Sequence, residues 1–303
     1  MRTCKLFLIH GIGNEKSSSE QIVSTWLNSL KSAWARDGFD AGSLQIETAA
    51  AFYGDRLATL TQNWLKNELS IVDQGTDTEA PVDPAIITLY QEYEGALIDA
   101  GVAIPPEATD DETIEEMGFP HHKGVKRLAR MIEAMSPENG NFLAKKFLPQ
   151  AAAYIRRPGA ASIIDEIVEA QLSQHLKDGP VPVLVAHSLG TVVTYRVLRE
   201  AFTEKRFPLL LTLGSPLASE AIQKILPVPR LKPGNVEAWI NAADARDFVA
   251  LRHVLNVNTF GSADVRNLEN IVNTQEDRHS IEGYLANSFI SREIWNALSV
   301  ASY

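Results

Sequence analysis

Short apolar runs alternate with longer amphipathic stretches over the first quarter and the second half of this chain. The amphipathic stretches at 20–36 and 159–177 place their apolar residues at helical spacing. Runs typical of buried strands occur at 5–9, 44–52, 181–185, 209–213 and 236–242. This alternation predicts an α/β fold with a mostly parallel sheet flanked by helices. We expect 236–242 to be the last clear strand and 281–299 to form one closing helix.

The α/β alternation stops between residues 57 and 158. Helical spacing recurs there, with Pro149 as a kink or a boundary, and segments rich in breakers predict loops at 73–84 and 102–120. The helices are expected at 57–72, 85–100, 123–135 and 141–157. We interpret 57–158 as a helical cap inserted into a core formed by 1–56 and 159–303, because so long a connection is unusual in a compact domain. The alternative is a set of ordinary surface helices.

Residues 186–190 read Ala-His-Ser-Leu-Gly and lie between a predicted strand and a predicted helix. A serine flanked at two residues on either side by small residues is typical of a nucleophile elbow. The tight turn lifts the hydroxyl of Ser188 above the sheet and places it at a helix N-terminus. Ser188 is therefore the candidate nucleophile, with Ala186 at a position where glycine is usual.

The first predicted strand runs directly into His10-Gly11-Ile12-Gly13. Glycines at these positions allow the backbone to turn so that an amide faces the serine. We expect the backbone N–H groups of Ile12 and Leu189 to form an oxyanion hole, and His10 to be a structural hydrogen-bonding residue.

These motifs resemble the α/β-hydrolase superfamily, particularly its lipases and esterases. The matching segments are 6–13, 184–190, 211–217 and a late Asp…His pair, in the order that the family has them. Nothing between about 57 and 158 matches the family. The resemblance implies an α/β-hydrolase sheet, a Ser-Asp-His triad and hydrolysis through a covalent acyl-enzyme, with no metal or organic cofactor.

The acid and base are expected in loops at the carboxyl ends of the last strands, where sites form in open parallel sheets. Asp244 and Asp247 both follow the strand that ends at 242. Asp247-Phe248-Val249 resembles the Asp-Pro-Val pattern of the family's acid more closely, so the resemblance favours Asp247, with Asp244 left open. His279 is the last histidine and is followed at once by the closing helix, as the family's base is. The His-x-x-x-x-Tyr-Leu spacing of 279–285 is similar to that of lipases, so the resemblance makes His279 the candidate base. The acid that does not contact His279 is expected to cap a turn or to pair with an arginine.

The chain of 303 residues has a formal net charge of −10 and a pI near 5.2. This balance argues against a nucleic-acid partner and against docking on anionic lipid. The chain has one cysteine, and its first apolar run is shorter than a signal peptide requires. No run reaches the length of a membrane span, and no metal-ligand spacing is recognisable. We therefore expect a cytoplasmic protein, while the oligomeric state is left open.

Two functions follow as hypotheses. The first is a serine hydrolase that cleaves carboxylic esters of small-molecule or lipid-like character, with Ser188, Asp247 and His279 as its triad. The second is a catalytically weak or inactive scaffold that binds a partner or a lipid, because a fold does not guarantee activity. Natural substrate, acyl-chain length, and the choice between ester, thioester and amide are not readable from the residues.

Overall fold

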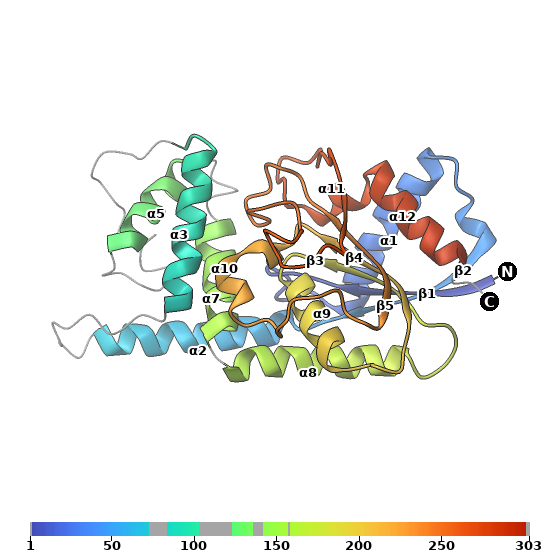
Figure 1. The fold of residues 1–303 in the computed structure, drawn as a ribbon, viewed down its shortest axis with the longest axis horizontal. Coiled ribbons are helices and arrows are strands. Elements are labelled where there is room, and N and C mark those ends of the chain that lie inside the picture. The colour runs from blue at the N-terminus through green and yellow to red at the C-terminus, as the bar shows by residue number, and fades with distance from the viewer. Residues whose placement is uncertain (1, 73–83, 103–122, 136–141, 157, 301–303) are drawn as a thin grey trace.

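The computed structural model describes residues 2–72, 84–102, 123–135, 142–156 and 158–300 (Figure 1). Its strands form one all-parallel, six-stranded sheet in the order β2-β1-β3-β4-β5-β6. The strands are β1 (Arg2–Ile9), β2 (Leu44–Ala51), β3 (Val183–His187), β4 (Phe207–Leu213), β5 (Val236–Ala242) and β6 (Arg266–Leu268). The predicted α/β fold with a parallel, helix-flanked sheet is confirmed.

The strand order reverses between β1 and β3. After β1 the chain moves to one side of the sheet and builds β2, and it later returns to the other side of β1 to build β3. Helices diverge from such a switch point, which leaves a crevice at the carboxyl ends of the two strands. The residues that follow β1 and β3, beginning with His10 and Ser188, meet at this crevice.

The sheet is buried on both faces because its apolar side chains alternate between two cores. In β1, Leu6 and Leu8 point into one cluster and Phe7 and Ile9 into the other. Every residue of β3 is buried, as expected for a central parallel strand.

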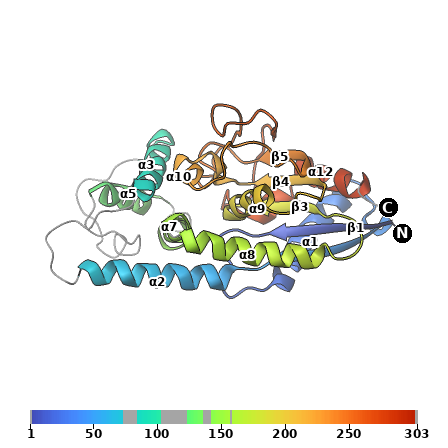
Figure 2. The same cartoon turned by 60° about the horizontal axis from the view of Figure 1, so that its bottom comes forward.

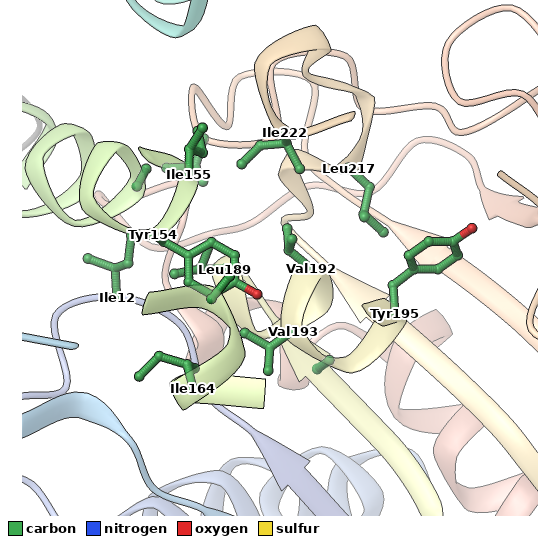
Figure 3. Packing of buried hydrophobic residues seen from close by; sticks show 14 of the residues in the cluster. Ile12, Tyr154, Ile155, Ile164, Leu189, Val192, Val193, Tyr195, Leu217 and Ile222 are labelled. Carbon is green, nitrogen blue, oxygen red and sulfur yellow. The ribbon is translucent and has the colours of Figure 1, made fainter. Parts of the chain in front are cut away.

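Helices cover the two faces of the sheet (Figures 1 and 2). The helices α1 (Ser19–Arg36), α11 (Ile281–Leu285) and α12 (Ser288–Val300) pack on one face. The other face is covered by α8 (Pro158–His175) and α9 (Leu189–Glu200). Figure 3 shows this second cluster, with Leu189, Val192 and Val193 of α9 beside Tyr154 and Ile164.

Two short elements differ from the sequence expectations. The closing segment is two helices, because Asn287 caps a new one: its Oδ1 accepts the N–H of Phe289 at 3.0 Å. A sixth strand, β6, follows the last predicted one and pairs with the end of β5 at the sheet edge. Further short elements are η1 (Ala41–Ser43), η3 (Pro216–Ala218) and α10 (Glu220–Gln223).

The segment interpreted as a cap contains the predicted helices. They are α2 (Gly54–Val72), α3 (Pro84–Asp99), α5 (Lys123–Glu133), the π-helical turn η2 (Phe142–Phe147) and α7 (Leu148–Arg156). Pro149 is the second residue of α7, so it marks a boundary. Figures 1 and 2 show α3 and α5 beyond the carboxyl ends of the strands. The loops expected at 73–84 and 102–120 lie almost wholly outside the described residues, and the division into core and cap stays a prediction.

Candidate active site

Ser188 occupies the sharp turn between β3 and α9. Its backbone has φ 56° and ψ −133°, a conformation that non-glycine residues rarely adopt. Such strain costs on the order of 1–3 kcal/mol and persists only where the surroundings enforce it. Here the N–H of Ser188 donates to the carbonyl of Leu213 at 3.0 Å, so the adjacent strand holds the turn.

Two glycines let the turn pack closely against the end of β1. A Cβ built on Gly11 would lie 2.8 Å from Oγ of Ser188, and one built on Gly190 would lie 2.3 Å from the carbonyl oxygen of His10. No larger residue fits at either position. The loop after β1 is therefore packed directly against the serine, while the expected orientation of the Ile12 N–H stays a prediction.

The two proposed oxyanion residues flank this contact. Ile12 and Leu189 are both buried. Leu189 is the first residue of α9, where backbone N–H groups have no partner within the helix. Asn14 holds the loop that carries Ile12, because its Nδ2 donates to the carbonyl oxygens of Gly11 at 3.1 Å and Ile12 at 3.3 Å.

His10 supports the loop from behind. Its Nε2 accepts the N–H of Tyr53 at 3.2 Å, which leaves Nδ1 to donate to the carbonyl of Gly11 at 2.6 Å. Burial lowers the pKa of His10 to about 4, so the ring is neutral at pH 7. The predicted structural role of His10 agrees with these contacts.

The structure brings His279 together with Asp247. Nδ1 of His279 lies 2.8 Å from Oδ2 and 3.0 Å from Oδ1 of the carboxylate. Both side chains are buried, and Oδ1 of Asp247 also accepts the N–H of Val249 at 2.9 Å. A carboxylate at Nδ1 fixes the tautomer in which Nε2 is free to accept a proton.

Asp244 has a different set of partners. Its Oδ1 accepts the N–H of Arg246 and its Oδ2 the N–H of Asn273, both at 2.8 Å. Nε of Arg246 lies 3.4 Å from the same carboxylate. Asp244 therefore caps the turn and joins two loops, while Asp247 is the acid in contact with His279.

The backbone of His279 is held on both sides. Its N–H donates to Oδ1 of Asp277 at 2.8 Å, and its carbonyl oxygen lies 2.8 Å from Nε2 of His187. The rings of His187 and His279 are 4.5 Å apart between centroids. Burial, and secondarily the nearby His279, keep the pKa of His187 well below its ordinary value. His187 is thus a neutral donor beneath the candidate base, a role that its place in the motif did not reveal.

The two atoms expected to exchange a proton are both buried and unpaired. Oγ of Ser188 and Nε2 of His279 have no hydrogen-bond partner within the described part of the chain. Ser188 is 1% exposed and His279 is 6% exposed. The two atoms therefore do not bond to each other in this structure, and the proton transfer expected from the sequence requires them to approach.

A small cavity of about 20 Å³ lies beside His279, with room for roughly one water. Phe142 of η2 forms part of its wall, and its ring is 5.8 Å from the ring of His279. The same phenylalanine approaches Gly13, where an added Cβ would lie 3.6 Å from it. Phe142 therefore lies near both the loop after β1 and the candidate base. The cavity is lined by Phe142, Leu143, Arg246, Asp247, Phe248, Val249, Asp277, Arg278 and His279.

Three residues make contacts with Asp247 or His279 that the sequence did not specify. Gly214, directly after β4, has φ 53° and lies so close that a Cβ would be 2.7 Å from Oδ2 of Asp247. Tyr284 donates to the same oxygen at 2.6 Å. A glycine after a predicted strand was a usable signal for the first, and the His-x-x-x-x-Tyr-Leu spacing was one for Tyr284. Phe142 was marked only as one apolar residue of a predicted helix.

Within the described ranges, no cluster of three or more His, Cys, Asp or Glu side chains could hold a metal ion. His121 and His122 lie outside those ranges. Nor does any helix of the described segments combine the length and hydropathy needed to cross a bilayer.

Comparisons of the chain with models of protein families, with curated proteins and with solved structures found no match. The α/β class thus follows from the sheet and its helices, and the chemistry has to be argued from the site itself.

Proposed function

We propose that this protein is a serine hydrolase of the α/β-hydrolase type that cleaves carboxylic esters. The observation that carries the proposal is the pair of His279 and Asp247, 2.8 Å apart and buried at the carboxyl end of the sheet that also presents Ser188. The strained turn and the glycines packed against it support the same chemistry.

In the proposed reaction Nε2 of His279 takes the proton of Ser188, whose Oγ attacks the acyl carbon. Asp247 accepts the Nδ1–H bond and stabilises the imidazolium that forms. The N–H groups of Ile12 and Leu189 donate to the oxyanion. The alkoxide leaves with the proton from His279, and a water deprotonated by His279 then releases the acid and frees the serine.

Esters are proposed as substrates from the lipase-like motifs, since thioesters and amides react through the same groups. The net charge of −10 favours a small acyl ester over a nucleic acid as the partner. We also propose a cytoplasmic location. The ring of Phe142 borders the cavity beside His279, 5.8 Å from the histidine ring, and we propose that it limits how an ester approaches this residue.

Covalent labelling by a fluorophosphonate tests the proposal. The wild-type chain should be labelled once, at Ser188, and should hydrolyse p-nitrophenyl acetate. Ser188→Ala should lose both properties and keep its circular dichroism and melting temperature. Ser24→Ala, on the exposed face of α1, is the matched control and should behave as wild type. Parallel assays with a thioester and an anilide of the same acid then rank the acyl bond.

The burial of Ser188 favours one alternative, a scaffold that binds a partner or a lipid without turnover. That alternative predicts no labelling of the folded wild-type chain at any reagent concentration. Labelling that survives in Ser188→Ala would also refute the assignment of the nucleophile.

A further inference from the structure

The hydroxyl of Tyr284 connects the two acidic residues that follow β5. Tyr284 lies on α11 and is fully buried. Its oxygen accepts the backbone N–H of Asp244 at 3.0 Å, and its O–H donates to Oδ2 of Asp247 at 2.6 Å. Oδ2 is also the oxygen nearest to Nδ1 of His279, at 2.8 Å.

We propose that Tyr284 is a positioning residue, whose hydrogen bond to Asp247 sets how strongly this carboxylate attracts the proton on Nδ1 of His279. The consequence for catalysis rests on the proposed hydrolase function. The effect on His279 itself does not, because it follows from three side chains in contact.

The direction of the hydroxyl proton is determined by its surroundings. A phenol has one proton to donate, and the N–H of Asp244 already points at the oxygen. The proton of Tyr284 is therefore directed to Asp247. Burial first, and then the charge of Asp247, raise the pKa of Tyr284 above its ordinary value, so the hydroxyl stays protonated and remains a donor.

Tyr284 and His279 share one carboxylate oxygen. A hydrogen bond from the phenol stabilises the charge of Asp247 and makes its Oδ2 a weaker acceptor for the imidazole. Without the phenol the carboxylate becomes more basic and its bond to Nδ1–H strengthens. The imidazolium form of His279 is then favoured, so the pKa of His279 rises.

Other charged and titratable groups face His279 from the neighbouring elements. His187 lies at the end of β3, Asp277 accepts the N–H of His279, and Arg246 and Arg278 line the cavity beside the ring. None of these four groups makes a recorded hydrogen bond to Tyr284. Tyr284→Phe also removes the acceptor of the Asp244 N–H, and Asp244 in turn holds Arg246, so the variant reaches Arg246 indirectly. A variant that keeps the hydroxyl leaves all four groups in place.

The test is an NMR titration of His279 in the full chain with labelled histidine, without substrate. Tyr284→Phe should raise the pKa of His279 by about 1 unit, the size expected when one hydrogen bond to a charged group is lost. Tyr195→Phe is the matched control: it removes a hydroxyl bonded to the carbonyl of Leu231 at 3.1 Å and should leave His279 unchanged.

Incorporation of 3-fluorotyrosine at position 284 gives the opposite perturbation and keeps the ring and its hydroxyl. The more acidic phenol is a stronger donor, so the pKa of His279 should fall. If Tyr284→Phe does not fold, this substitution decides the question alone. An unchanged pKa in the fluorinated protein, or a lowered one in Tyr284→Phe, would overturn the proposal.

Kinetics then test the catalytic consequence separately. In Tyr284→Phe, kcat should fall about ten- to hundredfold, as when other groups that orient a catalytic side chain are removed. KM should be unchanged, and the acid limb of the pH profile should move to higher pH. A wild-type chain without esterase activity would refute the proposed function, while the titration would still decide the role of Tyr284.

Discussion

Gly214 offers a sharp test of how the candidate site is packed. This residue follows β4 and has a positive φ of 53°. A Cβ added there would lie 2.7 Å from Oδ2 of Asp247 and 3.0 Å from Nδ1 of His279. Both distances are shorter than ordinary van der Waals contact. Gly214→Ala should therefore displace the buried pair.

The expected cost has two parts. A left-handed backbone costs a residue with a Cβ roughly 1–2 kcal/mol. Displacing the carboxylate weakens a hydrogen bond to a charged group, which contributes about 1.5–3 kcal/mol. Gly38→Ala isolates the first part, because Gly38 has φ 80° and nothing within 4 Å of the added Cβ. Gly214→Ala should thus be less stable than Gly38→Ala by about 1.5–3 kcal/mol.

Urea denaturation of the two variants measures this difference. The ester assay should show a second difference between the variants. If Asp247 and His279 are the proposed catalytic pair, displacing them by about 1 Å lowers the rate on the order of a hundredfold. Gly38→Ala should retain wild-type kcat/KM. If Gly214→Ala is as stable and as active as Gly38→Ala, the packing of Asp247 and His279 against β4 described above is wrong.

Three further predictions concern the acid, the closed site and a buried histidine. Asp247→Asn should lower kcat on the order of 10⁴-fold through the wrong histidine tautomer, whereas Asp244→Asn should mainly reduce stability; equal losses would contradict the assignment. Phe142→Ala should raise kcat/KM for an octanoate ester relative to a butyrate ester. The expected gain is roughly tenfold for every two methylenes admitted, at about 0.8 kcal/mol for each methylene. Phe289→Ala, whose ring is exposed on α12, is the control, and an unchanged preference in Phe142→Ala would show that Phe142 does not close an acyl site. The pKa of His10 is lowered to about 4 by burial, so the unfolded chain binds the extra proton and stability is lost as pH falls from about 6.5 towards 4. Urea titrations should show a loss of about 3 kcal/mol from this residue between pH 7 and pH 4; His10→Asn should flatten that slope.

The features that could be read from the sequence are those whose physical requirements are local. The strand before Ser188 needs an apolar run, the turn needs small residues at 186 and 190, and the helix after it needs residues that favour helix. All of these lie within about twenty positions. The same holds for the long helices, whose apolar spacing alone predicts their inward face. The three-residue strand β6 has no such pattern, because pairing with β5 at the sheet edge is what makes it a strand.

The choice between Asp244 and Asp247 was decided only by tertiary structure. The two lie three residues apart in one turn, and the histidine that distinguishes them lies 32 positions further along the chain from Asp247. The residues after Asp247 favour it over Asp244 but leave the choice open, and the contacts of Tyr284 with its oxygen and of Phe142 with the histidine ring are not readable locally. Such contacts depend on how strands and loops distant in sequence converge at one edge of the sheet. A periodic pattern of apolar residues predicts which face of an element is buried, but it does not predict which residues pack against that face.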